Sequence, residues 1–170
     1  MRVLGIDPGT AVMGYGVVED GSSRHPVLVE CGTLTAPSRA PLPVRLRVLY
    51  EGVSELLSRH TPGALAVESA FYGRNVRTAV VLSHARGVIL LAGELAGVDL
   101  AEYSPASVKK AIVGRGAALK PQVGYMVSQL LRLRSAPAPA DAADGVAVAL
   151  AHLIVATRQA AFFHQVAGAR

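Results

Sequence analysis

Three short apolar segments open the chain, and only turn signals separate them. Residues 2 to 6, 14 to 19 and 27 to 35 have the composition of strands. Pro8-Gly9 and residues 20 to 23, Asp-Gly-Ser-Ser, are turn signals. Strands joined by such short connections pair antiparallel. The first 35 residues therefore predict a three-stranded antiparallel meander.

Helix and strand patterns alternate after the meander. Residues 43 to 60 carry apolar residues at helical spacing and end at Thr61-Pro62-Gly63, where Pro and Gly stop a helix. Strands follow at residues 64 to 69 and 98 to 104, and helices at residues 75 to 96, 105 to 113, 121 to 134 and 141 to 158. We expect an α/β fold with a five-stranded mixed sheet, its first three strands antiparallel, flanked by helices. Residues 1 to 158 would form one domain, and residues 159 to 170 a frayed C-terminal tail.

The composition bounds the class of protein. The sequence holds 17 Lys and Arg against 12 Asp and Glu, a formal net charge of +5, and its mean hydropathy is +0.38. Its long apolar runs are interrupted by Gly, Glu, Arg or His before they reach the roughly 20 residues of a spanning helix. The charged start and long apolar stretch of a secretion signal do not precede Asp7. We expect a cytoplasmic protein that does not enter a membrane.

The positive charge is concentrated in the middle of the chain. Residues 74 to 134 hold nine Lys and Arg against three Asp and Glu, and the remainder is nearly neutral. A basic segment of this kind favours a polyanionic partner such as DNA. Lys109, Lys110, Arg115 and Lys120 surround a glycine-containing loop where cations can follow phosphates. Taken singly, each of them is better explained as a solvated surface charge.

Two carboxylates follow strands of the predicted sheet, and two more share one helix turn. Asp7 ends the first strand and Glu68 the fourth. Asp141 and Asp144 lie on one helix face, because they are three residues apart. Asp7 also suits a turn before Pro-Gly, and the helix pair suits an N-cap and an acidic first turn. Glu68 is harder to explain structurally, since a carboxylate after Leu-Ala-Val loses its water unless a cation or hydrogen bonds meet it.

A divalent cation would account for these carboxylates together. If the first and fourth strands are neighbours, Asp7 and Glu68 emerge at one edge of the sheet, and the helix start completes an all-oxygen site. Such ligands suit Mg²⁺ or Mn²⁺. Two such ions about 4 Å apart activate a water and stabilise the leaving oxygen in phosphodiester hydrolysis. An acidic cluster beside a basic surface thus indicates a nuclease.

Several stretches in collinear order carry a resemblance to a known family: GIDPGTAVMGYGVV, VESAFYGRN, ARGVIL, SPASVKKAIVGRGAALKPQV and DAADGVAVALAH. Together they resemble the RuvC family of Holliday-junction-resolving endonucleases over about residues 1 to 157. The resemblance implies a ribonuclease-H-like fold and a homodimer that resolves four-way junction DNA by paired symmetric nicks, in recombination and repair. It also implies cooperation with the RuvA and RuvB branch-migration proteins.

The motifs of the family assign roles to single residues. The residues that match its four catalytic, metal-binding carboxylates are Asp7, Glu68, Asp141 and Asp144. Phe71 matches a position that stacks on an unpaired base, and Lys109 and Lys120 match basic residues near the active centre. The remaining candidate DNA contacts are Tyr72, Arg74, Lys110 and Arg115. For Tyr72, packing in the core is an equal alternative.

One residue departs from the family pattern. Gly145 stands where the resemblance leads us to expect Ala. Since Gly is a poor helix former, it should loosen the first turn of the last helix by up to about 1 kcal/mol. No ligand is removed by this change.

The symmetric reaction implied by the resemblance needs two active sites related by a two-fold axis. The helix over residues 76 to 96 is the candidate interface, because its apolar residues are too numerous for one core-facing stripe. They include Val80, Val81, Ala85, Val88 and Ile89. We therefore expect a homodimer.

Two other classes of protein are alternatives. GIDPGT also resembles the first phosphate-binding loop of actin-like ATPases and sugar kinases. Those proteins need a second phosphate loop and an adenosine motif in a larger second half, for which we expect no room in 170 residues. A non-catalytic DNA-architectural module is disfavoured, because carboxylates on a phosphate-binding face repel DNA unless metal neutralises them.

Overall fold

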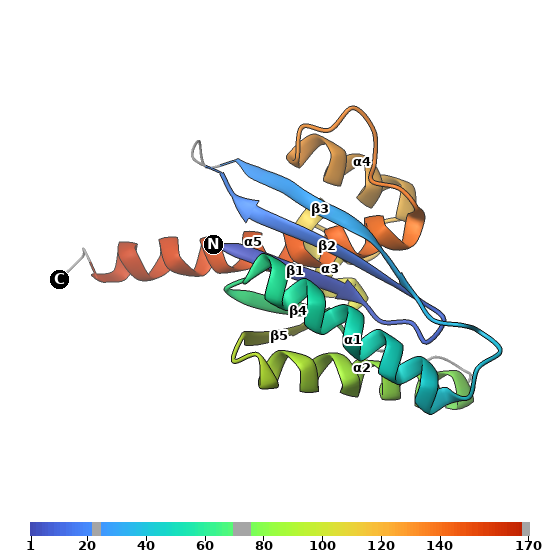
Figure 1. The fold of residues 1–170 in the computed structure, drawn as a ribbon. Helices are drawn as coiled ribbons and strands as arrows, with labels where there is room; N and C mark the ends of the chain where they lie inside the picture. Colours follow the sequence, from blue (N-terminus) through green and yellow to red (C-terminus); the bar gives the residue numbers. More distant parts are fainter. Residues whose placement is uncertain (22–24, 70–75, 168–170) are drawn as a thin grey trace.

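The computed structural model describes residues 1–21, 25–69 and 76–167 of the chain (Figure 1). Its strands are β1 (Arg2–Asp7), β2 (Val12–Asp20), β3 (Pro26–Thr35), β4 (Ala64–Glu68) and β5 (Asp99–Tyr103). Its helices are α1 (Leu42–His60), α2 (Val76–Leu95), α3 (Pro105–Val113), α4 (Lys120–Leu130) and α5 (Ala140–Ala167). This element order confirms the predicted α/β class.

The strands form one mixed sheet of five in the order β3-β2-β1-β4-β5. β1 pairs antiparallel with β2, and β2 with β3, so the predicted meander is confirmed. β1 pairs parallel with β4, and Ile6 lies opposite Val67. The next residue on each strand is acidic, Asp7 and Glu68 respectively. Both therefore leave the sheet at the same edge, as expected for neighbouring strands.

Alternating side chains give the sheet two different faces. Leu4 and Ile6 are buried in the apolar cluster that includes residues of α1 and α2. Val3 is buried in a second cluster, with residues of α3, α4 and α5. Because side chains alternate along a strand, Asp7 lies on the same face as Val3. Figure 1 shows α1 and α2 on one side of the sheet and α5 crossing the other.

Helix α5 lies so close to the sheet that the contact requires glycine. A Cβ atom on Gly14 of β2 would lie 1.8 Å from the backbone oxygen of Asp141. A Cβ atom on Gly145 would lie 2.5 Å from the Cα atom of Tyr15. Gly145 therefore does more than loosen its helix, because it lets the backbone of α5 rest directly on β2. Since Gly14 pairs with Asp7 in the sheet, the first turn of α5 is held beside the end of β1.

Two helix ends differ from the prediction. α4 ends at Leu130, about one turn earlier than expected. The chain turns away there because Arg132 adopts a left-handed backbone conformation with a φ of 53°. α5 continues to Ala167, so the predicted end at residue 158 is wrong, and residues 159–167 are helical rather than frayed. No Gly or Pro interrupts this half of α5, which extends beyond the sheet in Figure 1.

Two of the described helices are long and apolar enough to cross a membrane, by length and composition alone. The stretches are Thr78–Leu95 in α2 and Ala140–Phe162 in α5. Gly, His and charged residues still interrupt both stretches, but their mean hydropathy stays high because these residues are isolated among Ala, Val and Leu. Half of the stretch in α5 is buried, as in the central helix of a globular fold.

We predict that Gly14→Ala destabilises the fold by at least about 2 kcal/mol, because the added methyl group meets backbone and overpacking costs about 1 to 3 kcal/mol. Gly87→Ala in α2 is the control, since a Cβ atom there meets nothing within 4 Å. Urea denaturation of both variants and the parent measures the difference. Equal stability of Gly14→Ala and the parent would show that α5 can move away from β2 without cost.

Candidate active site

A cleft of about 400 Å³ opens where β1 and β4 end. Three carboxylates from three elements line it: Asp7 of β1, Glu68 of β4 and Asp144 of α5. Lys109 of α3 and Lys120 of α4 also line it. The apolar wall consists of Pro105, Val108, Val123 and Ala147. The cleft thus brings together three of the four predicted carboxylates and two of the predicted cations.

The two lysines reach the cleft from helices that pack against α5. The hydroxyl of Ser104 accepts a hydrogen bond from the backbone amide of Ser107 at 3.1 Å and caps α3. Val108, next to Lys109 in the chain, is buried in the cluster that includes α5. Lys120 is the first residue of α4. Packing of regular elements therefore sets the position of both cations.

Burial raises the pKa of two carboxyl groups in the cleft. The pKa of Asp7 is raised from its ordinary 3.8 to about 6, first by burial and then by the charge of Asp144, against the effect of Lys120. The pKa of Glu68 is raised from 4.5 to about 7, first by burial and then by the charges of Asp7 and Asp144. A cation bound among these groups would lower both values. The cleft therefore favours the binding of additional positive charge.

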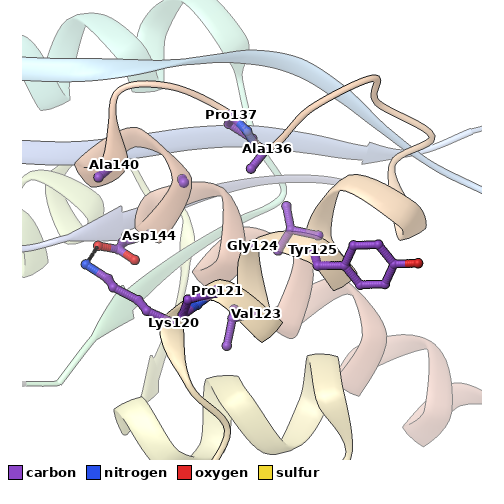
Figure 2. Close-up of a pocket in the computed structure, with 11 residues that line it drawn as sticks. Lys120, Pro121, Val123, Gly124, Tyr125, Ala136, Pro137, Ala140 and Asp144 are labelled. Carbon is purple, nitrogen blue, oxygen red and sulfur yellow. Dashed lines mark ion pairs between the residues drawn. The ribbon is translucent and has the colours of Figure 1, made fainter.

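One positive charge is already present, because Lys120 pairs with Asp144. The Nζ atom of Lys120 lies 2.7 Å from Oδ2 of Asp144 (Figure 2). This hydrogen bond raises the pKa of Lys120, so the lysine stays charged. The lysine side chain is 71% exposed, and such a solvent-facing pair contributes little stability. Lys120 can therefore leave Asp144 when another cation takes its place.

The donor set suits a hard divalent cation, but the side chains do not converge on one point. Within residues 1–21, 25–69 and 76–167, no group of three or more His, Cys, Asp or Glu stands close enough to hold one ion. Carboxylate oxygens are nevertheless the ligands that Mg²⁺ and Mn²⁺ prefer. One oxygen of Asp144, Oδ2, faces Lys120 in this arrangement.

Asp141, the fourth predicted carboxylate, lies near the cleft without lining it. Asp141 is exposed in the first turn of α5. Its charge adds to the raised pKa values of Asp7 and Lys120. In this arrangement Asp141 therefore acts on the site through its charge and not by contact.

The other candidate DNA contacts fall into two groups. Lys110 and Arg115 are exposed and do not line the cleft. Phe71, Tyr72 and Arg74 lie outside the described residues, so their roles stay predictions. Lys109 therefore lines the cleft, whereas its neighbour Lys110 does not.

Sequence reasoning missed the apolar wall of the cleft and a polar pair behind it. The hydroxyl of Tyr103 lies 2.9 Å from Nδ1 of His152, and burial lowers the pKa of His152. Tyr103 is also the sheet partner of Glu68, so the pair supports the strand end that carries this carboxylate. A histidine inside an apolar helical pattern was the available signal, and nothing in the pattern indicated Tyr103.

The sequence matches one protein family over most of its length. A family model described as crossover junction endodeoxyribonuclease RuvC matches residues 3–152. The crossover junction endodeoxyribonuclease RuvC of Halorhodospira halophila is 52% identical over 151 residues, which cover 89% of each chain. The protein of the same name from Alkalilimnicola ehrlichii is 51% identical over 159 residues, 94% of each chain.

Solved structures share the fold. Thermus thermophilus RuvC is 36% identical, with a TM-score of 0.86 over 94% of this chain and 97% of that one. The same protein in complex with a Holliday junction substrate is 34% identical, with a TM-score of 0.84 over 93% and 96% of the two chains. These likenesses confirm the predicted ribonuclease-H-like class.

We predict that Asp7→Asn stabilises the metal-free protein at pH 8 but not at pH 4. The folded-state pKa of Asp7 lies above its ordinary value, so the linked stability is present below about pH 4 and is lost as the pH rises through about 6. The expected gain at pH 8 is about 1 to 3 kcal/mol, since one pKa unit corresponds to about 1.4 kcal/mol. Urea denaturation in EDTA measures it, with the exposed Asp20→Asn as control. A loss of stability at pH 8 would contradict the raised pKa.

Proposed function

The chain belongs to the RuvC family of crossover junction endodeoxyribonucleases, and from this premise we propose that it resolves four-way DNA junctions by hydrolysing one phosphodiester bond in each of two opposed strands. The meeting of Asp7, Glu68 and Asp144 in one cleft is the observation that carries the proposal. The Holliday junction complex of T. thermophilus RuvC supports the choice of substrate. Such a reaction serves homologous recombination and DNA repair.

The proposed cofactors are two divalent cations per site, Mg²⁺ or its substitute Mn²⁺. Asp7, Glu68 and Asp144 would hold them in the cleft, with Asp141 approaching from the first turn of α5. When bound, the cations supply an activated water molecule and stabilise the leaving oxygen. The raised pKa values of Asp7 and Glu68 support this assignment, because a bound cation favours the ionised carboxylates.

The lysines of the cleft are proposed to hold the DNA strand. Lys109 lines the cleft and is assigned to the reacting phosphate. Lys110 and Arg115 are exposed outside it and are assigned to phosphates farther along the backbone. Lys120 now pairs with Asp144; with cations bound, Asp144 would be among the residues that hold them, and Lys120 would be free to face the strand and balance the charge of a phosphate.

Three further DNA contacts are proposed on the family motif alone. Phe71 would stack on an unpaired base, which is worth about 1 to 3 kcal/mol for an aromatic side chain. Tyr72 and Arg74 follow in the same motif and would contact the adjoining DNA. All three come directly after the strand that carries Glu68 into the cleft.

A homodimer is proposed because paired nicks require two sites about a two-fold axis. Helix α2 is the proposed interface, since only 22% of its apolar stretch is buried. Val80, Leu91 and Leu95 are 51%, 54% and 66% exposed. Ala85 and Ile89 are fully buried in the core of the chain itself, so they belong to the core-facing stripe of α2 and not to the proposed interface.

Cooperation with RuvA and RuvB and a cytoplasmic location are further parts of the proposal, and family membership is their support. The exposed apolar side chains of α2 are assigned to the dimer rather than to a membrane. A second copy of the chain would cover them in the same step that pairs the two active sites.

We predict that Asp7→Asn, Glu68→Gln and Asp144→Asn each lower the rate of junction cleavage by more than about 100-fold. Mutation of a residue that only hydrogen-bonds to a metal ligand already lowers metal affinity or activity by about 10 to 100-fold, and loss of a ligand itself should cost more. Junction binding should stay within about threefold, since the lost charge holds cations rather than DNA. Single-turnover cleavage of a synthetic four-way junction in Mg²⁺, and binding in Ca²⁺, measure the two effects.

Glu55→Gln is the matched control, because Glu55 is exposed on α1, across the sheet from the cleft. It should cleave at the parental rate. If any of the three carboxylate variants cleaved at the parental rate, the substituted residue would not belong to the active site. Failure of the parent protein to nick the junction, while it binds, would reject the proposed reaction.

We predict that the parent protein sediments as a dimer at micromolar concentration and that Leu91→Lys sediments as a monomer. A charged side chain at this position would have to lose its water in an apolar interface. Val27→Lys is the control, because Val27 is 46% exposed on β3, away from α2. A monomeric parent, both free and with junction DNA, would contradict the proposed dimer.

A further inference from the structure

A second cavity, of about 420 Å³, adjoins the carboxylate cleft, and we call it the α4–α5 cavity. Lys120, Val123 and Asp144 line both spaces. The other lining residues come from α4, from the segment before α5 and from the start of α5: Pro121, Gly124, Tyr125, Val127, Ala136, Pro137, Ala140 and Ala143. In Figure 2 the ion pair lies on one side of this cavity and Tyr125 on the other, with its ring directed outward from the remaining lining residues.

The lining of this cavity is almost entirely apolar. Apart from the ion pair and the hydroxyl of Tyr125, its side chains are those of Pro, Val and Ala, with one Gly. Tyr125 is 63% exposed, so an aromatic ring stands open to solvent at the rim. The volume lies in the range of about 300 to 1,000 Å³ that small-molecule sites occupy. The cavity is therefore large enough for a weakly polar ring that arrives from solvent.

The shared residues indicate which group this is. In the proposed function, a strand held for cleavage would bring its reacting phosphate to the carboxylates and to Lys120, which line the cleft. The nucleotides on either side of that phosphate then lie next to the α4–α5 cavity, because Lys120 and Asp144 form its boundary. We propose that this cavity receives the base of a nucleotide flanking the cleaved phosphate, with Tyr125 as its stacking surface. This inference rests on the proposed function and extends it to a contact that selects the cleavage position.

The physical basis is the exchange of one stacking partner for another. A base that leaves the DNA stack loses contacts with its neighbours, and an aromatic side chain restores part of them. The loss is smallest where the base is already unstacked. In the proposed complex Lys120, which pairs with Asp144 in the chain alone, would face the reacting phosphate, so that the base and its backbone would be held together. Cleavage is then fastest where a base can enter.

Gly124 allows the cavity to be filled without a clash. A Cβ atom at Gly124 would meet only the Cβ atom of Ala136, at 3.7 Å, which is an ordinary contact. Leu at this position would extend into the cavity, and it favours the helix more than Gly does. Gln129→Leu is the matched control, because Gln129 is exposed on the same helix and does not line the cavity. Tyr125→Ala is a second variant, which removes the ring and adds nothing.

The test compares single-turnover cleavage of an intact junction with that of junctions abasic at either nucleotide flanking the cleaved phosphate. For the parent and for Gln129→Leu, one abasic position should slow cleavage by about 5 to 100-fold, the equivalent of one lost stacking contact. Gly124→Leu and Tyr125→Ala should cleave the intact junction more slowly than the parent. For these two variants, the abasic substitution at the same position should lower the cleavage rate by less than about a further twofold. Thermal unfolding of each variant confirms that it is folded.

Three results would overturn the inference. Gly124→Leu and Tyr125→Ala could respond to the abasic position as the parent does, which would leave the cavity without a base. The parent and all three variants could cleave the abasic junctions as fast as they cleave the intact one. If the parent cleaves the intact junction, this result rejects the present inference and leaves the proposed function standing. Lack of parental cleavage of the intact junction rejects the proposed function as well.

Discussion

The direct contact between the backbones of α5 and β2 is the constraint on which the site depends. At Gly14 no side chain separates the helix from the sheet, and the backbone oxygen of Asp141 takes the space of a Cβ atom. Gly14 pairs with Asp7, so this contact sets the first turn of α5 beside the end of β1. Asp144 then reaches the cleft from the helix while Asp7 and Glu68 reach it from the strands. A larger side chain at the contact would lift α5 and separate these carboxylates.

Two glutamates on opposite sides of the sheet have pKa values that are shifted in opposite directions. Glu30 accepts a hydrogen bond from the hydroxyl of Tyr15 at 2.7 Å and lies 2.8 Å from Nε2 of His60. The hydrogen bond from Tyr15 lowers the pKa of Glu30 most strongly. The pKa of Glu68 is raised to about 7 by burial and by neighbouring carboxylates. Partners stabilise the ionised form of Glu30, whereas the surroundings of Glu68 disfavour its ionised form, and perturbed groups of this kind cluster at functional sites.

Much of the architecture follows from local sequence patterns. The meander, the order of helices and strands, and the position of Asp7 and Glu68 at strand ends were all predicted, because alternation and turn chemistry depend on near neighbours. The helical spacing of Asp141 and Asp144 is local in the same sense. The family resemblance added roles for these residues that periodicity does not contain. The predicted set of four carboxylates is therefore a property of the chain that can be read without its fold.

Other features depend on contacts between segments far apart in the chain. The pairing of Lys120 with Asp144, and the α4–α5 cavity beside it, exist only because α4 and α5 pack together. The need for Gly145 comes from the backbone of β2, more than a hundred residues earlier in the chain. The apolar residues of α2 could not be sorted by pattern into buried Ala85 and exposed Leu91, because the helix is apolar on most sides. Local propensity decides which elements form, but the close packing of their surfaces decides which side chains meet and which stay exposed.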